Sequence, residues 1–397
     1  MEKVCLLVDF DDSGLAEDWQ EKVYSFDLML EVNYCTSEEV FPMLSSGGVV
    51  GLVIFSQKPR QDIFEVLDEF KKNIGAFPSF QAVVCDEPDP IFMTQVYEWG
   101  VETFFRSEEW AEQTAILTKH ISTVFKDEEA SESKVYELNQ SILSGNQVKI
   151  VESEEAVAEY AEYDYLAAYS RGKALQATGR FNEAVEAFSQ AKHMNSKFRP
   201  AVSGIGENLL VLGKVDEAIE IFDELEKVNK HNVSRKADLA SAYIEKGDFQ
   251  KAKEYLKEAN KMNPGHPRIA ETKAHYLMSS GKIGEAFKIM DGLSDVGPFF
   301  AAKLNETGIK LSQQGKGKSA LALYKKAHKI VRPELKYKIS LNAALACYRM
   351  KELNVAMKYL LRCEKEAGKK LEKVDKIKGA INKAQKKKPS KPVKTAG

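Results

Sequence analysis

A glycine stands at every thirty-fourth position through the second half of this 397-residue chain. A small residue precedes each of these glycines by seven positions, and an alanine follows each by five, as Gly172 and Ala184 do around the first. Between these positions apolar residues follow helical spacing. A fixed period of this length indicates stacked units, each a pair of helices. The glycines are Gly179, Gly213, Gly247, Gly281 and Gly315.

The residue types at these positions fit a helix pair. A bulky residue stands nine positions after each glycine, for example Phe188 and Tyr324. Small residues where two antiparallel helices cross would let such side chains fill the gap between them, and a glycine at the turn would end the first helix. Three positions after the bulky residues stand Ala191, Leu225, Ala259, Leu293 and Ala327, which the same pattern places on the second helices.

The pattern, seen most clearly in residues 172–191 and 240–252, resembles the tetratricopeptide repeat (TPR) family. The resemblance implies a right-handed superhelix whose first helices line a concave groove that holds a segment of a partner protein. For each groove residue the alternative is a packing or solvated role. The lysine, arginine and asparagine set of the chaperone-binding subclass is missing, with Lys173 nearly alone. Projecting the repeat register predicts these partner-binding residues: Tyr169, Lys173, Gln176, Glu207, Leu210, Ser241, Ile244, Glu271, His275, Met278, Asn305 and Ile309.

The register predicts a solenoid over residues 165–370, in which the sixth unit lacks the turn glycine and slips by two positions. Residues 126–134 are polar and indicate a domain boundary, and residues 127–164 are predicted to be a linker with an incomplete repeat. Residues 371–385 suit a helix that caps the solenoid. The predicted repeats span 165–198, 199–232, 233–266, 267–300, 301–336 and 337–370.

Residues 1–126 alternate short apolar runs with amphipathic stretches. Five strand–helix units of this kind predict an α/β domain with a five-stranded parallel sheet of flavodoxin-like type, covered on both faces. The predicted strands are residues 4–8, 26–32, 49–55, 80–85 and 103–105, and the predicted helices are residues 16–24, 38–44, 62–73, 90–99 and 110–125.

This order resembles the receiver domain of bacterial response regulators, in which an aspartate after the third strand accepts a phosphoryl group. The resemblance implies a degenerate site made of Asp9, Asp11, Asp12, Ser56 and Arg106. Ser56 stands where the phosphoacceptor aspartate is expected. The positions that correspond to the second acid of the usual pair, the hydroxyl and the lysine hold Phe10, Val84 or Cys85, and Ser107 or Glu108. The domain is therefore predicted to dock proteins without being phosphorylated.

Charge is distributed unevenly along the chain. Residues 1–130 hold 26 acidic and 9 basic residues, a net charge of −17, and the remainder carries a net charge of +15. Such halves can attract each other, choose opposite partners or remain two solvated surfaces. Residues 386–397 form a basic, proline-interrupted tail that is predicted to be disordered and could contact nucleic acid, anionic lipid or the acidic half.

Other chemistry has little support in the sequence. The five cysteines form no CxxC pair, and the histidines form no ligand pair, so neither a metal nor a cofactor is predicted. The lack of a long apolar run or a secretory leader favours a cytoplasmic protein.

The leading hypothesis is a non-enzymatic bacterial regulatory adaptor that binds partner proteins through the TPR groove and the receiver-like surface. The alternatives are a phosphorylation-responsive regulator with a TPR output domain and a tether to nucleic acid or membrane through the basic tail.

Overall fold

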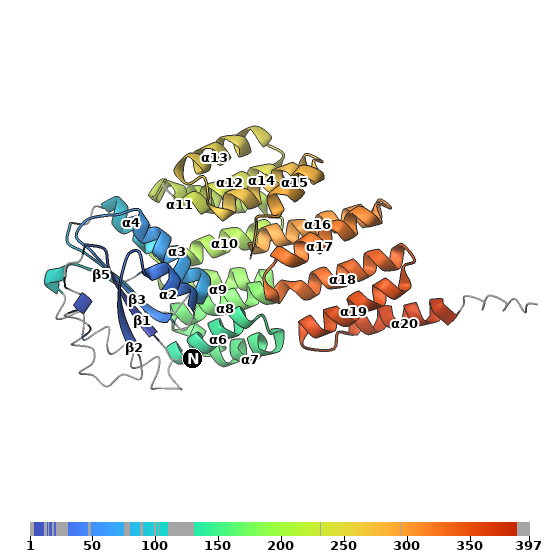
Figure 1. Ribbon diagram of the computed structural model, residues 1–397, viewed down its shortest axis with the longest axis horizontal. Helices are drawn as coiled ribbons and strands as arrows, with labels where there is room; N and C mark the ends of the chain where they lie inside the picture. Colours follow the sequence, from blue (N-terminus) through green and yellow to red (C-terminus); the bar gives the residue numbers. More distant parts are fainter. Residues whose placement is uncertain are drawn as a thin grey trace, which may run out of the picture.

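The computed structural model describes residues 4–11, 14, 16–17, 20, 31–46, 49–74, 80–87, 90–98, 101, 103–109, 131–230, 232–294 and 296–386. Figure 1 shows a parallel sheet with helices at one end of the molecule and a curved array of helix pairs that extends away from it. The predicted combination of an α/β domain and a helical solenoid is therefore present. The basic tail lies outside the described residues from residue 387 onward.

The sheet is parallel with strand order β2-β1-β3-β4-β5, a doubly wound order that reverses direction between β1 and β3. Its central strands are buried on both faces, as Leu6 and Leu7 illustrate with 0% exposure each. Such burial suits a parallel sheet. The strands are β1 (Val4–Asp9), β2 (Glu31–Thr36), β3 (Val49–Ser56), β4 (Phe80–Cys85) and β5 (Thr103–Phe105), and the helices described with them are α2 (Val40–Ser46), α3 (Asp62–Ile74) and α4 (Pro90–Glu98).

The second strand differs from the expected one. The apolar run predicted a strand at residues 26–32, whereas β2 spans Glu31–Thr36 and pairs with β1 from Val4↔Glu31 to Asp9↔Thr36. The reason is that β2 is an edge strand. Among residues 32–36, for which burial is described, only Val32 and Cys35 are buried, so the strand lacks a continuous apolar signal. The predicted helix at residues 110–125 lies outside the described residues, as does most of the one at 16–24.

The described array consists of helix pairs followed by one terminal helix. Gly179 ends the first helix of its pair with φ at 84°, a left-handed conformation that glycine adopts without strain. The helices are α6 (Ser131–Ser144), α7 (Gln147–Ala158), α8 (Tyr165–Thr178), α9 (Phe181–Met194), α10 (Arg199–Val211), α11 (Val215–Val228), α12 (Val233–Lys246), α13 (Phe249–Met262), α14 (Pro267–Ser279), α15 (Ile283–Met290), α16 (Pro298–Gln313), α17 (Gly317–Ile330), α18 (Pro333–Arg349), α19 (Leu353–Ala367) and α20 (Glu372–Lys386).

The small residues lie at helix crossings, as their spacing predicts. A Cβ atom built on Gly172 would lie 2.7 Å from the Phe188 ring, and one built on Gly308 would lie 2.5 Å from the Tyr324 ring. Phe188 and Tyr324 are almost completely buried. Close approach of the two helices in these pairs therefore depends on the missing side chain.

The segment before the first clear repeat is more regular than expected. The sequence predicts a polar boundary segment that includes residues 131–134. In the structure these residues form the first turn of α6, and Ser133 is buried. The Ser131 hydroxyl donates a hydrogen bond to the Asp164 carboxylate, so polar residues here tie α6 to the start of α8. Helix α7 also forms, capped by the Asn146 side chain, which accepts from the backbone N–H groups of Val148 and Lys149. Residues 131–158 thus form a full helix pair.

The pair α14/α15 is cut short. Helix α15 ends at Met290, so Leu293, expected on a second helix, lies beyond its end. Gly292, Gly297 and the helix-starting Pro298 make a longer helix unfavourable here. The connection instead runs alongside the end of α17, where the Val296 N–H donates to the Ile330 carbonyl at 2.9 Å. Helix α16 then lies on the concave side of the preceding repeats, where it contacts α10 and α14 (Figure 1).

The α/β domain sits at the start of the array. Helix α3 contacts α6, and α4 contacts α10, whereas α20 lies at the opposite end of the molecule (Figure 1). Within the described residues the acidic domain therefore packs on the first repeats and is remote from the lysine-rich α20.

Candidate functional site

The predicted partner-binding residues all lie on the first helices of their pairs, from α8 to α16. We call this surface of α8, α10, α12 and α14 the inner face. It is not an open groove in this structure. Lys173, Glu207, Asn305 and Ile309 are partly exposed, whereas the other eight predicted residues are buried: Tyr169, Gln176, Leu210, Ser241, Ile244, Glu271, His275 and Met278.

Helix α16 covers much of the inner face. Its first turn places Phe299 in the same apolar core as Tyr243 and Ile244, with the His275 ring 5.3 Å away. Four residues later, the Lys303 ammonium pairs with Glu245 at the end of α12. Helix α16 also contacts α10, three pairs earlier in the array. The concave face predicted to hold a partner segment thus holds a helix of the same chain.

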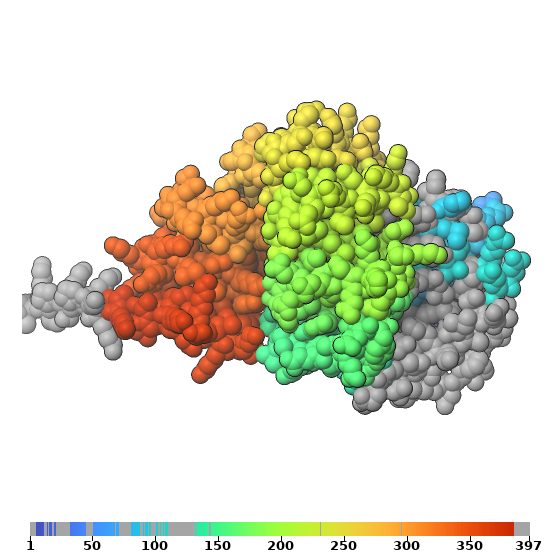
Figure 2. All heavy atoms as spheres, turned by 180° about the vertical axis from the view of Figure 1, so that it is seen from behind, coloured from blue at the N-terminus to red at the C-terminus, as the bar shows by residue number. Residues whose placement is uncertain are grey.

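The start of α18 closes the remaining gap between the ends of the curve. The Gln147 side-chain amide donates to the backbone carbonyl of Glu334 at 3.2 Å, and the Lys338 ammonium donates to the carbonyl of Thr178 at 3.3 Å. Gly145 lies directly against Pro333. We call these contacts the clasp. Figure 2 shows the closure from behind, where residues 150–210, in green, lie against residues beyond 300, in orange and red.

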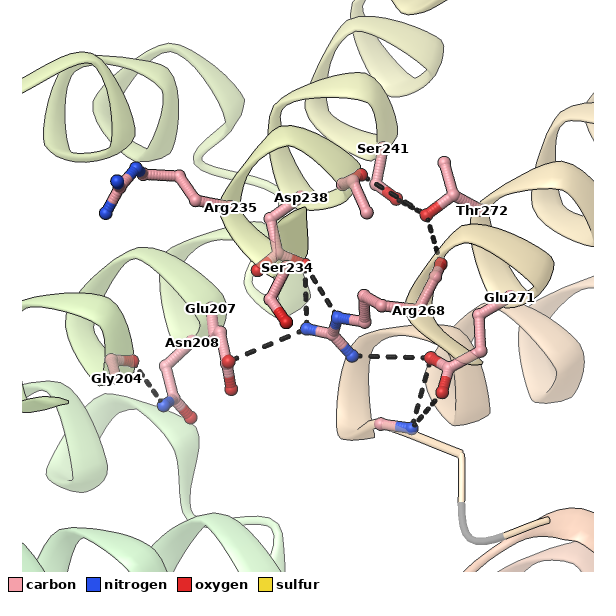
Figure 3. Close-up of polar contacts among 12 residues, drawn as sticks. Gly204, Glu207, Asn208, Ser234, Arg235, Asp238, Ser241, Arg268, Glu271 and Thr272 are labelled. Carbon is pink, nitrogen blue, oxygen red and sulfur yellow. Dashed lines mark hydrogen bonds and ion pairs between the residues drawn. The ribbon is translucent and has the colours of Figure 1, made fainter. Parts of the chain in front are cut away.

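A buried charge cluster joins α10, α12 and α14 (Figure 3). The Arg268 guanidinium lies 2.7 Å from the Asp238 carboxylate, 3.3 Å from that of Glu271 and 3.6 Å from that of Glu207. Glu271 also accepts from the backbone N–H of Gly297 at 3.2 Å, immediately before α16. One guanidinium thus faces three carboxylates, and one of these, Glu271, also holds the start of α16 at the inner face.

Burial shifts the proton equilibria of these groups. Desolvation raises the pKa of Asp238 to about 7, against the opposing effect of Arg268, and it also raises the pKa of Glu271. Desolvation of Asp238 and Glu271 outweighs the compensation by Arg268, so burial favours the protonated form of these two carboxylates. On α8, desolvation lowers the pKa of Lys173, which Glu207 and Glu334 partly offset. The inner face is thus a desolvated, strongly electrostatic environment.

Polar atoms of two predicted inner-face residues are buried without hydrogen bonds. The Gln176 amide nitrogen and His275 Nδ1 have no partner within the described part of the chain. Their residues are 3% and 1% exposed. Since a buried unpaired polar group costs about 1–3 kcal/mol, the closed inner face is imperfectly matched to its own occupant.

The carboxyl edge of the sheet brings together part of the predicted phosphorylation site. The Ser56 hydroxyl lies 3.3 Å from the Asp11 carboxylate, which also accepts from the backbone N–H of Gln57 at 2.6 Å. Asp9 is buried at the end of β1 beside it. Arg106 is directed elsewhere, since it is exposed and pairs with Glu108 at 3.7 Å. Asp12 lies outside the described residues.

Arg60, which sequence reasoning missed, completes this edge. Its guanidinium lies 3.4 Å from Asp11 and 2.9 Å from Asp62, donates to the Phe10 carbonyl at 3.3 Å and lies over the Phe10 ring. A cation of the chain therefore lies beside Asp11, one of the acids of the predicted degenerate phosphorylation site. Among the described residues no group of three histidine, cysteine or acidic side chains could hold a metal ion.

Arg268 and Gln147 were missed as well. Arg268 follows Pro267 at the start of α14, and a lone arginine near the start of a helix carries no sequence signal of a buried network. Gln147 lies in the segment that is predicted to be a linker with an incomplete repeat. In the described part of the chain, no helix combines the length and apolar character needed to cross a membrane.

Comparison with known proteins identifies the repeats. A family model described as tetratricopeptide repeat matches residues 153–231, and a second with the same description matches residues 243–302. No curated protein matches the chain.

Three solved structures illustrate the likeness. A TPR protein from Parabacteroides merdae shares 14% identity with a TM-score of 0.37, covering 64% of this chain and 98% of its own. A thermophilic TPR protein from Thermus thermophilus shares 20% identity with a TM-score of 0.32, covering 55% and 100%. Yeast Tom70 shares 14% identity with a TM-score of 0.43, covering 76% and 66%. On the family-model matches and the helix pairs described above, residues 153–231 and 243–302 of this chain are tetratricopeptide repeats.

Proposed function

We propose that this chain is a non-enzymatic regulatory adaptor that binds partner proteins through its TPR array, with the α/β domain as a second docking module. The observation that carries the proposal is the TPR array itself, since TPR proteins in general mediate protein–protein interactions. The inner face adds support, because it carries both charges and unpaired polar groups that a protein segment could engage.

Affinity capture followed by cross-link mapping tests this function. The full chain serves as bait, and a globular protein of similar size and charge serves as the control. We expect specifically retained proteins whose cross-links concentrate on residues 131–386. Retention of no protein beyond the control bait would contradict the adaptor function. Cross-links confined to residues 1–109 would assign binding to the α/β domain alone.

The receiver-like character of the α/β domain is part of the proposal. The strand order and the acids that follow β1 favour it. Phosphorylation is disfavoured, because Ser56 replaces the acceptor and Arg60 already pairs with Asp11. Addition of Mg²⁺ and beryllofluoride while tryptophan fluorescence is followed separates the two functions, since all three tryptophans lie within residues 1–110. A saturable response would favour a phosphorylation-responsive regulator over an adaptor.

A tether function has one structural argument in its favour. Lys373, Lys376 and Lys383 are exposed on α20, so the basic character of the tail continues along the last described helix. If the chain binds nucleic acid or anionic vesicles, deletion of residues 387–397 should weaken that binding, and the affinity should fall steeply with salt. Unchanged binding after deletion would exclude the tail as the tether.

A further inference from the structure

We propose that the inner face is a latent site for a helical partner segment that presents an aromatic residue followed four positions later by a lysine, and that α16 occupies this site in cis while the clasp holds the array closed. This inference rests on the adaptor function proposed above and specifies its binding site. The partner chemistry is taken from the occupant itself.

The first argument is the division of the apolar cores. One core comprises buried residues of α6 to α13 together with Phe299, and a second comprises buried residues of α14 to α18, including Phe300. Phe299 therefore belongs to the first core although its own helix belongs to the second. A residue shared in this way marks where one block of the array is inserted into the other.

The second argument is the polar nature of the contacts that α16 and α18 make with the rest of the array beside the one of Phe299. They include Lys303 with Glu245, the backbone N–H of Gly297 with Glu271, and the hydrogen bonds of the clasp. Polar contacts can be exchanged for water or for an equivalent partner at little cost, unlike a continuous apolar core. The contacts of α16 and α18 with the inner face and with the first pairs are thus the place where the array can open.

The third argument concerns the inner face after opening. Gln176 and His275 would each offer a polar atom that has no partner in the described structure. Glu245 would lose Lys303 and would favour a new cation. The His275 ring and the apolar core around Tyr243 would favour an aromatic residue one helical turn away, as Phe299 is from Lys303.

The clasp provides a selective way to open the array. A Cβ atom built on Gly145 would lie 2.4 Å from Pro333 Cβ and 2.9 Å from the Glu334 backbone nitrogen, so Gly145→Ala should force α18 away. Gly213→Ala is the matched control, because Gly213 has a similar positive φ of 78° and no atom within 4 Å of the added Cβ. Both variants place alanine at a positive φ and are strained in the same way. Only in Gly145→Ala does the added methyl group clash with α18.

The experiment combines hydrogen exchange with binding of a labelled peptide that copies residues 297–313. In the full chain, Gly145→Ala should accelerate exchange across residues 165–178 and 298–313 and bind the peptide at least about tenfold more tightly than wild type or Gly213→Ala, because the competing cis occupant is released. Phe299→Ala or Lys303→Ala in the peptide should abolish this binding. Phe300→Ala in the peptide should retain it, because Phe300 packs within its own block.

Each failure has a separate meaning. Equal exchange in Gly145→Ala and Gly213→Ala would overturn closure by the clasp. Faster exchange without peptide binding would overturn the latent site, while partner capture by the full chain would still decide the adaptor function. If Gly145→Ala does not fold, the pair Gln147→Leu and Lys338→Met removes the hydrogen bonds of the clasp without a wedge. Its control is Arg349→Met, which removes a hydrogen bond to Ser312 between neighbouring pairs.

Discussion

The Asp238 carboxylate lies 2.7 Å from the Arg268 guanidinium, across the boundary between α12 and α14. Both side chains are largely buried, and Glu207 and Glu271 share the same guanidinium. The contact is therefore part of a cluster in which burial raises the pKa of Asp238 and of Glu271. Its stability depends on how many protons the cluster holds.

This cluster predicts that stability falls as pH rises from about 4 to about 7. The folded-state pKa of Asp238 is raised from 3.8 to about 7, so in this range the folded chain binds more protons than the unfolded chain. The effect is at most about 4 kcal/mol, from about 1.4 kcal/mol per pKa unit. Urea unfolding at pH 5 and pH 8 measures it. Asp238→Asn should reduce the difference, and an unchanged difference in this variant would contradict the assignment.

Lys351 predicts a stabilising substitution. It is the one described non-glycine residue with positive φ, at 62°, and it occupies the turn that lacks the glycine of the other repeats. Lys351→Gly should raise the free energy of unfolding by about 1 kcal/mol, because a side chain in this conformation is strained. Thermal or urea unfolding measures the change. Lys351→Ala should have little effect, and an equal gain from both variants would show that backbone strain is not the cause.

A side chain at Gly308 is expected to lower the free energy of unfolding. Gly308→Ala places a methyl group 2.5 Å from the buried Tyr324 ring and should lower stability by about 1–3 kcal/mol. Gly379→Ala is the control, since Gly379 lies within α20 and has no atom within 4 Å of an added Cβ. The control should gain up to about 1 kcal/mol from helix propensity. Similar effects of the two substitutions on urea unfolding would disprove close packing at Gly308.

The position of Arg60 beside Asp11 predicts that two substitutions can create a metal site at this edge of the sheet. Ser56→Asp together with Arg60→Ala replaces the cation of the chain by a carboxylate beside Asp9 and Asp11, and the double variant should bind Mg²⁺. Titration calorimetry at constant ionic strength measures this. Ser56→Asp alone should bind Mg²⁺ at least about tenfold more weakly, because Arg60 still compensates Asp11. Equal affinities in the two variants would show that Arg60 does not block the site.

The repeat glycines and the small residues at helix crossings could be predicted from sequence because their roles are local. Gly179 ends its own helix, and Gly172 meets Phe188, which lies on the very next helix of the chain. The strands of the sheet, apart from the edge strand β2, followed from continuous apolar runs for the same reason.

Closure of the inner face could not be predicted in this way. It depends on the contact of Gly145 with Pro333, which results from the curvature summed over all intervening pairs and from the shortened α15. The glycines around residue 292 were visible in the sequence, but their effect on the path of α16 was not. Arg60 escaped notice because only the folded loop after β3 returns it to Asp11.

The contact of α18 with α6 and α8 also bears on folding. An open repeat array has only neighbour contacts, so it can lose terminal units one at a time. Here the clasp joins units far apart in the chain, since the hydrogen bond from Gln147 to Glu334 spans 187 positions. Loss of either end should therefore weaken the other, and the array should unfold with the high cooperativity of a single globular domain.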